Sequence, residues 1–140
     1  MTEQIIVRPQ KGPQTLFINL ETEIQIVYYG GSAGGGKSAA LLMDFLKYMD
    51  DPNFYAVYFR KTTKQLERTL WPAAKKMYYP FLIEHSGPKK GKFKGQANVQ
   101  EGKHLITFPS GARAEFAYME HDKDADFNWQ GAELSAVYWD

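Results

Sequence analysis

A glycine-rich segment in the first third of the chain has the residue types and spacing that bind a phosphate group. Residues 31–38 match the pattern G-x-x-x-x-G-K-[ST]. Glycines let the backbone turn its N–H groups inward around an anion, because side chains would block the close approach. The lysine is expected to reach the β- and γ-phosphates, and the serine is expected to ligate Mg²⁺. The residues of this expected phosphate loop are Gly31, Ser32, Ala33, Gly34, Gly35, Gly36, Lys37 and Ser38.

A nucleotide site of this kind also needs a carboxylate at the end of a neighbouring strand, where it holds Mg²⁺ through water. Asp140 follows the apolar run Leu134–Trp139, which is expected to end at the carboxyl edge of a sheet. Ligands bind at that edge in open α/β folds. We therefore expect Asp140 to serve the metal, and the alternative is a solvated terminal acid.

Arg60 ends another expected strand, Phe54–Phe59, and so is expected at the same edge. In phosphoryl-transfer sites an arginine stabilises the charge of the transition state, from its own subunit or from a neighbouring one. Arg60 is therefore a candidate catalytic residue together with Lys37 and Asp140. The alternative is an arginine that pairs with a nearby acid.

The elements that must position these residues alternate in type along the chain. Short apolar runs rich in β-branched and aromatic residues indicate strands, and runs of good helix formers indicate helices. A capping-box spacing at Thr62 and Gln65 marks one helix start, and Pro72 kinks that helix or begins a second one. The sequence thus predicts an α/β fold, with a mostly parallel sheet covered by helices on both faces and an inserted β-hairpin. The expected elements are a strand at Ile24–Tyr29, a helix at Ser38–Met49, a strand at Phe54–Phe59, a helix at Thr62–Tyr79, a hairpin of His104–Phe108 with Ala112–Tyr118, and a strand at Leu134–Trp139.

Composition sets the protein class. The chain has 140 residues, a net charge of +1 and no cysteine, which favours one globular domain in a reducing compartment. No run is long and apolar enough to predict a membrane span or a secretion signal. The net charge is close to zero, but basic residues are concentrated in the middle of the chain. Within that region, the glycine-rich segment Ser86–Gln96 is expected to be a loop that contacts a DNA backbone or is simply solvated. Its lysines are Lys89, Lys90, Lys92 and Lys94.

Taken in order, the motifs resemble the N-terminal ATPase part of a phage terminase large subunit. They are Gly12-Pro13-Gln14, YYGGSAGGGKS at 28–38, YFRKTTKQL at 58–66, FPSGARAEF at 108–116 and WQGAELSAVYWD at 129–140. The resemblance implies a P-loop NTPase fold with ATP and Mg²⁺ as cofactors. It also implies that Gln14 reads the adenine edge, that Lys37 and Ser38 bind phosphates and Mg²⁺, and that Asp140 is the Walker B aspartate.

The same resemblance implies an ATPase that translocates double-stranded DNA into procapsids in the host cytoplasm, without a membrane. Its implied partners are double-stranded DNA, a small terminase subunit, a portal protein and further copies in a homo-oligomeric ring. Residues 1–140 would be the N-terminal part of the ATPase domain, incomplete at its C-terminus. The family's catalytic glutamate and its C-terminal nuclease domain would lie beyond this segment, so we expect weak or no activity and marginal stability from it alone. Two alternatives stay open, namely another P-loop DNA-dependent ATPase of helicase-like type and a catalytically silent nucleotide-binding or assembly module.

Overall fold

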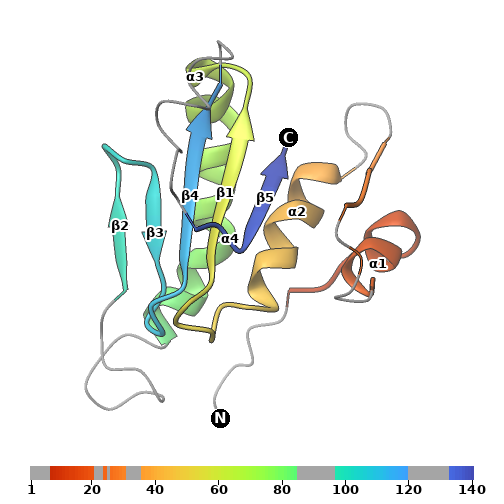
Figure 1. Ribbon diagram of the computed structural model, residues 1–140, viewed down its shortest axis with the longest axis horizontal. Helices are drawn as coiled ribbons and strands as arrows, with labels where there is room; N and C mark the ends of the chain where they lie inside the picture. The colour runs from red at the N-terminus through yellow and green to blue at the C-terminus, as the bar shows by residue number, and fades with distance from the viewer. Residues whose placement is uncertain (1–6, 21–23, 25, 31–35, 85–96, 120–132) are drawn as a thin grey trace.

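The computed structural model describes residues 7–20, 24, 26–30, 36–84, 97–119 and 133–140. Five strands in this part of the chain form one sheet, in the order β2-β3-β4-β1-β5 (Figure 1). The elements in chain order are α1 (Pro13–Ile18), α2 (Lys37–Leu46), β1 (Tyr55–Arg60), α3 (Thr63–Gln65), the π-helical turn η1 (Leu66–Leu70), α4 (Trp71–Glu84), β2 (Asn98–Gln100), β3 (Leu105–Thr107), β4 (Arg113–Tyr118) and β5 (Ala136–Trp139).

The sheet is mixed, where the sequence predicted a mostly parallel one. Strand β1 pairs in parallel with β4 and with β5, whereas β3 pairs antiparallel with both β2 and β4. Chain connectivity explains the difference, because the few residues between β2, β3 and β4 can only return the chain antiparallel, and a parallel pair needs a crossover of a dozen residues or more. The predicted hairpin is confirmed as β3 and β4. Strand β1, which ends with Arg60, and strand β5, which Asp140 follows, lie in the parallel half.

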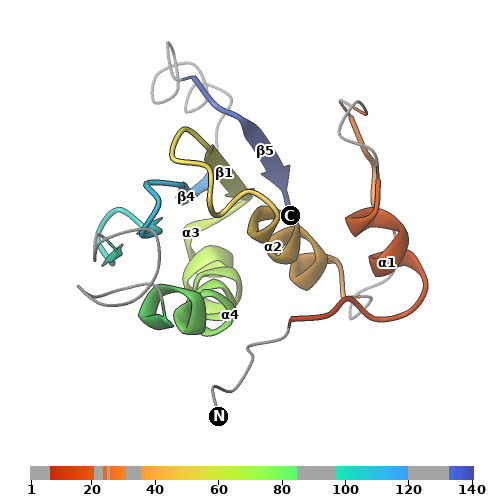
Figure 2. The same ribbon diagram turned by 90° about the horizontal axis from the view of Figure 1, so that it is seen from below.

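Helices α2 and α4 lie on the same face of the sheet, as the view from below shows (Figure 2). The prediction of helices on both faces is therefore wrong for the described part of the chain. On the opposite face Phe59 stacks against Trp139, with ring centroids 4.8 Å apart, and Trp139 remains 64% exposed.

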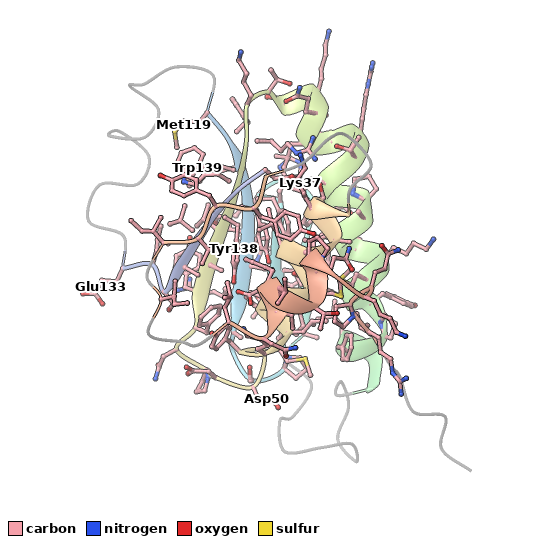
Figure 3. The ribbon with its side chains drawn as sticks, turned by 90° about the vertical axis from the view of Figure 1, so that its right-hand side faces the viewer. Lys37, Asp50, Met119, Glu133, Tyr138 and Trp139 are labelled. Carbon is pink, nitrogen blue, oxygen red and sulfur yellow. The ribbon has the colours of Figure 1, made fainter. Side chains whose placement is uncertain are left out.

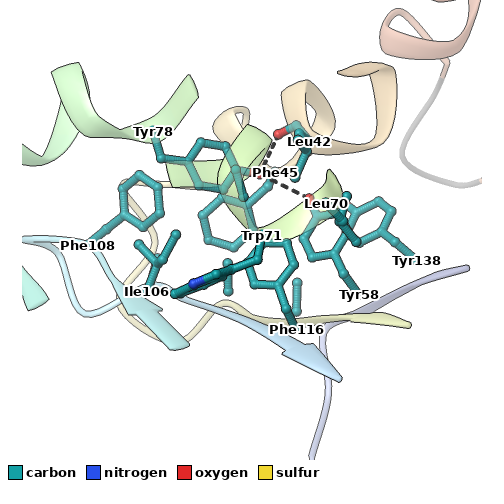
Figure 4. Close-up of a cluster of buried hydrophobic side chains, with 14 of the residues drawn as sticks. Leu42, Phe45, Tyr58, Leu70, Trp71, Tyr78, Ile106, Phe108, Phe116 and Tyr138 are labelled. Atoms are coloured by element: carbon teal, nitrogen blue, oxygen red, sulfur yellow. Dashed lines mark hydrogen bonds between the residues drawn. The ribbon is translucent and has the colours of Figure 1, made fainter. Parts of the chain in front are cut away.

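Aromatic side chains fill the space between the sheet and the two helices (Figure 4). The Tyr58 ring of β1 stacks between Phe116 of β4 and Tyr138 of β5, with centroids 4.7 and 4.5 Å away. Phe45 of α2 packs on Phe108 at 5.0 Å. Offset aromatic pairs of this kind add to the stabilisation from burying their area. The core thus fixes α2 against the parallel strands.

The predicted strand at Ile24–Tyr29 is wrong for those of its residues that the structure describes. Residues 24 and 26–30 form no strand, and the side chains of Ile26 and Tyr28 are 73% and 94% exposed. A strand needs a hydrogen-bonded neighbour as well as suitable side chains. Here Tyr29 packs edge-on against Phe17 of α1 at 5.6 Å, so this apolar run lies beside a helix that the sequence reasoning had not placed.

The other helices largely follow their predicted signals. The Thr62 side chain accepts a hydrogen bond from the Gln65 backbone N–H, which confirms the capping spacing. The helical run continues through η1 into α4 without a break, and Pro72 follows the π-helical turn directly as the second residue of α4. Helices commonly bend or change their hydrogen-bond pattern at a proline, because it lacks the backbone N–H. No helix in the described ranges combines the length and apolar character needed to cross a bilayer.

Three tyrosine hydroxyls tie α2 to its surroundings. Tyr58 donates to the Leu41 carbonyl at 2.8 Å, Tyr78 donates to the Leu42 carbonyl at 2.6 Å, and Tyr138 donates to an Asp44 carboxylate oxygen at 2.7 Å. Burial raises the pKa of all three hydroxyls above the ordinary value of 10.0, because the ionised form loses its hydration. They therefore remain donors across the physiological pH range.

These raised pKa values predict how stability changes at alkaline pH. Above about pH 10 the unfolded chain releases tyrosine protons that the folded chain retains, so the free energy of unfolding is maintained below pH 10 and falls above it. Tyr138→Phe should make the decline between pH 10 and 11 shallower, by up to about 1.4 kcal/mol per pH unit. Urea unfolding at fixed pH steps measures this slope. Tyr79→Phe removes an exposed hydroxyl from α4 and should keep the wild-type slope; equal slopes for both variants would contradict the prediction.

Candidate functional site

The parallel register of β1 and β5 places Arg60 beside Asp140. Phe59 is the register partner of Trp139, and the Asp140 N–H donates to the Phe59 carbonyl at 2.9 Å. Side chains alternate between the two faces of a strand, so residues 60 and 140 lie on the same face as Tyr58 and Tyr138, which is the face covered by α2. The two charged residues therefore end their strands on the helix side of the sheet.

Helix α2 begins at the edge of the sheet where β1 and β5 end (Figure 1). Its N-cap is Gly36, with φ 74° in the left-handed region, and its first two residues are Lys37 and Ser38. In Figure 3 Lys37 lies at the same end of the molecule as Trp139, the last residue of β5. The first N–H groups of an α-helix have no partner within the helix and carry partial positive charge, which favours an anion at this position.

The side chains of Ser38, Arg60 and Asp140 meet at this edge. The Ser38 Oγ lies 2.9 and 2.8 Å from the two carboxylate oxygens of Asp140, to which it donates. Arg60 donates from Nε to Asp140 Oδ2 at 2.9 Å and from Nη2 to the same oxygen at 2.5 Å. Arg60 Nη2 also lies 3.2 Å from Ser38 Oγ, which accepts its hydrogen bond. We call these three residues the Ser-Arg-Asp cluster.

Burial makes the charge balance of the cluster important. The Arg60 and Asp140 side chains are only 19% and 10% exposed. A carboxylate this far from water needs a positive partner or several hydrogen-bond donors, because desolvation of an unpaired charge is costly. Arg60 supplies both the charge and the donors.

The donor set of the cluster fits a hard cation such as Mg²⁺. Mg²⁺ prefers oxygen ligands, and sites of this kind combine one or two protein carboxylates with water and substrate phosphates. Ser38 Oγ is such an oxygen, and the Asp140 carboxylate, 2.8 Å from it, is placed to accept hydrogen bonds from water on a cation bound at Ser38. Within the described ranges no group of three or more acidic or histidine side chains forms a metal cage. A cation bound here would therefore depend on oxygens from a second ligand.

Gln14 connects α1 to the start of α2. Its side chain is 4% exposed, its amide nitrogen donates to the Gly36 carbonyl at 2.8 Å, and its amide oxygen accepts from the Gln10 N–H at 2.7 Å. A Cβ added at Gly36 would lie 2.3 Å from that amide nitrogen. In this structure Gln14 therefore fixes the backbone immediately before Lys37. Adenine recognition by Gln14 stays a prediction.

The structure thus brings together three of the predicted site residues, namely Ser38, Arg60 and Asp140, with Lys37 next to them in the chain. Arg60 pairs with a nearby acid, as its alternative interpretation had it, but in a largely buried position. The remaining phosphate-loop residues, Gly31 to Gly35, and the lysines at 89–94 lie outside the described residues.

The residues that hold α2 in place were not predicted from the sequence. Tyr58 and Tyr138 each precede a cluster residue by two positions, so strand alternation alone would assign them to the face that carries Arg60 and Asp140. No sequence signal indicated that Asp44 would accept the hydrogen bond from Tyr138. Helix α1 did carry a signal, because Pro13 follows Gly12 at the first helical position.

Comparison with known proteins identifies one family. Residues 28–140 match the family described as "Terminase large subunit, T4likevirus-type, N-terminal". The match covers most of the chain, from the residues that precede the glycine-rich segment through Asp140. No curated protein and no solved structure matches the chain.

The contact between Gln14 and Gly36 yields a prediction about stability. Gly36→Ala should lower the free energy of unfolding by about 1–2 kcal/mol for the left-handed backbone, with a further loss from the clash with the Gln14 amide. In the double variant with Gln14→Ala the clash disappears. The double variant should therefore lose about 1 kcal/mol less free energy of unfolding than the sum of the losses in the two single variants. Urea unfolding of the four proteins in this cycle measures the difference.

Gly102→Ala is the matched control for that cycle. A Cβ at Gly102 meets no atom within 4 Å, so this variant should stay within about 0.5 kcal/mol of the wild type. Strictly additive effects of Gly36→Ala and Gln14→Ala would contradict the assigned contact.

Proposed function

Because the chain belongs to the T4-like family of terminase large subunits, as an N-terminal segment, we propose that it is the ATP-binding part of a DNA-packaging motor. Membership implies a role in viral DNA packaging. The finer proposal is that the site at the start of α2 binds Mg²⁺–ATP and that its hydrolysis drives double-stranded DNA into procapsids.

The observation that carries this proposal is the contact between Ser38 and Asp140. These residues are 102 positions apart in sequence, yet a hydroxyl at a helix N-terminus and a carboxylate at a strand end lie 2.8 Å apart. A phosphate-binding helix start needs such a carboxylate beside it to hold the cation that accompanies the phosphates. The chain brings both groups to the edge at which α/β folds bind their ligands.

Each residue then has a defined role. Lys37, in the first turn of α2, would reach the phosphates and neutralise part of their charge, and the helix N-terminus would add its partial positive charge. Ser38 and Asp140 would hold the cation, Ser38 directly and Asp140 through water. Bound Mg²⁺ would withdraw charge from the phosphate oxygens and orient them for in-line attack. Catalysis in such sites comes from positioning and electrostatics, without a covalent intermediate.

Packaging proteins of this kind act within an assembly, and we propose the corresponding partners. They are double-stranded DNA, a small terminase subunit, a portal protein and further copies of the chain in a homo-oligomeric ring, all in the host cytoplasm. A ring would leave Arg60 with two possible targets, the nucleotide of its own subunit or that of a neighbour.

Nucleotide binding by this chain and by the protein from its full reading frame tests the proposal. Mg²⁺–ATP should bind to both forms, and Lys37→Ala should weaken that binding by about tenfold or more, because it removes a charge-assisted contact to phosphate. Titration calorimetry measures the affinity, and phosphate release measures turnover in the same samples.

Lys76→Ala, which removes an exposed lysine of α4, is the charge-matched control and should bind ATP like the wild type. Binding that depends on Lys37, with no turnover in either form, would support the silent nucleotide-binding module over the motor. If neither form binds ATP, or if Lys37→Ala and Lys76→Ala behave alike, the proposed nucleotide site is wrong.

A further inference from the structure

Arg60 donates hydrogen bonds to the same side-chain oxygens that are expected to hold a cation. Its Nη2 lies 2.5 Å from Asp140 Oδ2 and 3.2 Å from Ser38 Oγ, so one nitrogen contacts both side chains that are expected to hold the cation. Its Nε contacts Asp140 Oδ2 as well, at 2.9 Å. A guanidinium group carries a fixed positive charge at all accessible pH values and does not lose it on burial.

We propose that Arg60 is a built-in counter-charge that holds Ser38 and Asp140 in the absence of nucleotide and that a divalent cation must displace it to bind. Two positive charges that share the same pair of oxygens repel each other strongly, because the cluster is largely shielded from water. The hydroxyl and carboxylate already lie side by side, 2.8–2.9 Å apart, so the exchange moves the guanidinium and leaves the oxygens where they are.

The position of Arg60 favours displacement over permanent occupancy. It is the last residue of β1, and the chain continues through exposed Lys61 into α3, so its side chain lies at the end of the strand. Its backbone carbonyl remains fixed, because it accepts from the Met119 N–H at 3.0 Å. Only the side chain has to turn for the cation to take its place.

The inference rests on the proposed nucleotide site, but cation binding without nucleotide tests it separately. Mn²⁺ is the probe, and electron paramagnetic resonance measures the free ion in solutions of the purified chain. Arg60→Gln should bind Mn²⁺ about tenfold or more tightly than the wild type, because it releases the carboxylate and removes the competing charge. Arg60→Gln combined with Asp140→Asn should lose that gain.

Lys61→Gln is the matched control, since it removes one positive charge from the neighbouring exposed position. It should change Mn²⁺ affinity by less than about twofold, because exposed charges are screened by water and salt. A gain for Lys61→Gln equal to that for Arg60→Gln would mean that net charge alone sets the affinity. That result, or Mn²⁺ binding by Arg60→Gln that is no tighter than by the wild type, would overturn the proposal.

A second measurement uses the wild-type protein and so avoids any folding defect of the variants. With arginine labelled by ¹⁵N, the Arg60 Nε–H signal, assigned by its absence in Arg60→Lys, should show slow exchange with water because it donates to Asp140. Saturating Mg²⁺–ATP should shift this signal and speed its exchange. An unchanged signal at saturation would overturn the displacement, whereas failure of Mg²⁺–ATP to bind at all would overturn the proposed function as well.

Discussion

The parallel register between β1 and β5 is the constraint on which the rest of the site depends. It pairs Phe59 with Trp139 and so aligns the residues that follow them, Arg60 and Asp140, at one edge. Because strand side chains alternate, the same register puts Tyr58 and Tyr138 on the face that carries the two charges. A register shift of one residue would turn the acid toward the opposite face and separate it from Ser38.

Helix α2 can supply Ser38 to this edge only if its position along the sheet is fixed. Apolar packing alone is non-directional and would tolerate sliding of the helix. The hydroxyls of Tyr58, Tyr78 and Tyr138 remove that freedom, because each must keep a partner once it is buried and each finds one on α2. The partners span Leu41 to Asp44, one turn beyond the serine, so the core specifies the site through a few hydrogen bonds superimposed on aromatic packing.

Helix starts that depend on residues close together in the chain could be predicted from the sequence. Strands could not always be predicted, because a strand also depends on a hydrogen-bonded neighbour from elsewhere in the chain. The start of α2 and the capping of α3 depend on residues that are adjacent in the chain, such as Gly36 with Lys37 and Thr62 with Gln65, and both were predicted. The run from Ile24 to Tyr29 has the composition of a strand, yet in its described part it packs beside α1, because strand formation depends on an available neighbour. Strand β2 is three residues long, too short for a period of two to stand out.

In the candidate site, too, the residues that belong to a local motif could be predicted, whereas contacts between distant residues could not. Lys37, Ser38 and Asp140 follow from a motif and from the end of an apolar run, because the chemistry of phosphate and Mg²⁺ restricts residue types as well as spacing. The sequence did not predict whether Arg60 contacts a nucleotide or an acidic side chain, because that depends on which oxygen atoms the fold brings within reach of its guanidinium group.

The structure gives a physical reason why an arginine stands at the end of β1. A helix N-terminus that carries Lys37 favours an anion beside it, and Asp140 is such an anion, but a carboxylate that is 10% exposed also needs donors on its remaining lone pairs. Ser38 contributes a single hydrogen, so it satisfies only part of this requirement. A lysine at position 60 would bring a compact, strongly hydrated charge, whereas the planar guanidinium donates from Nε and Nη2 at once and reaches both Asp140 and Ser38. The arrangement keeps the carboxylate and hydroxyl side by side and gives the buried carboxylate a positive partner.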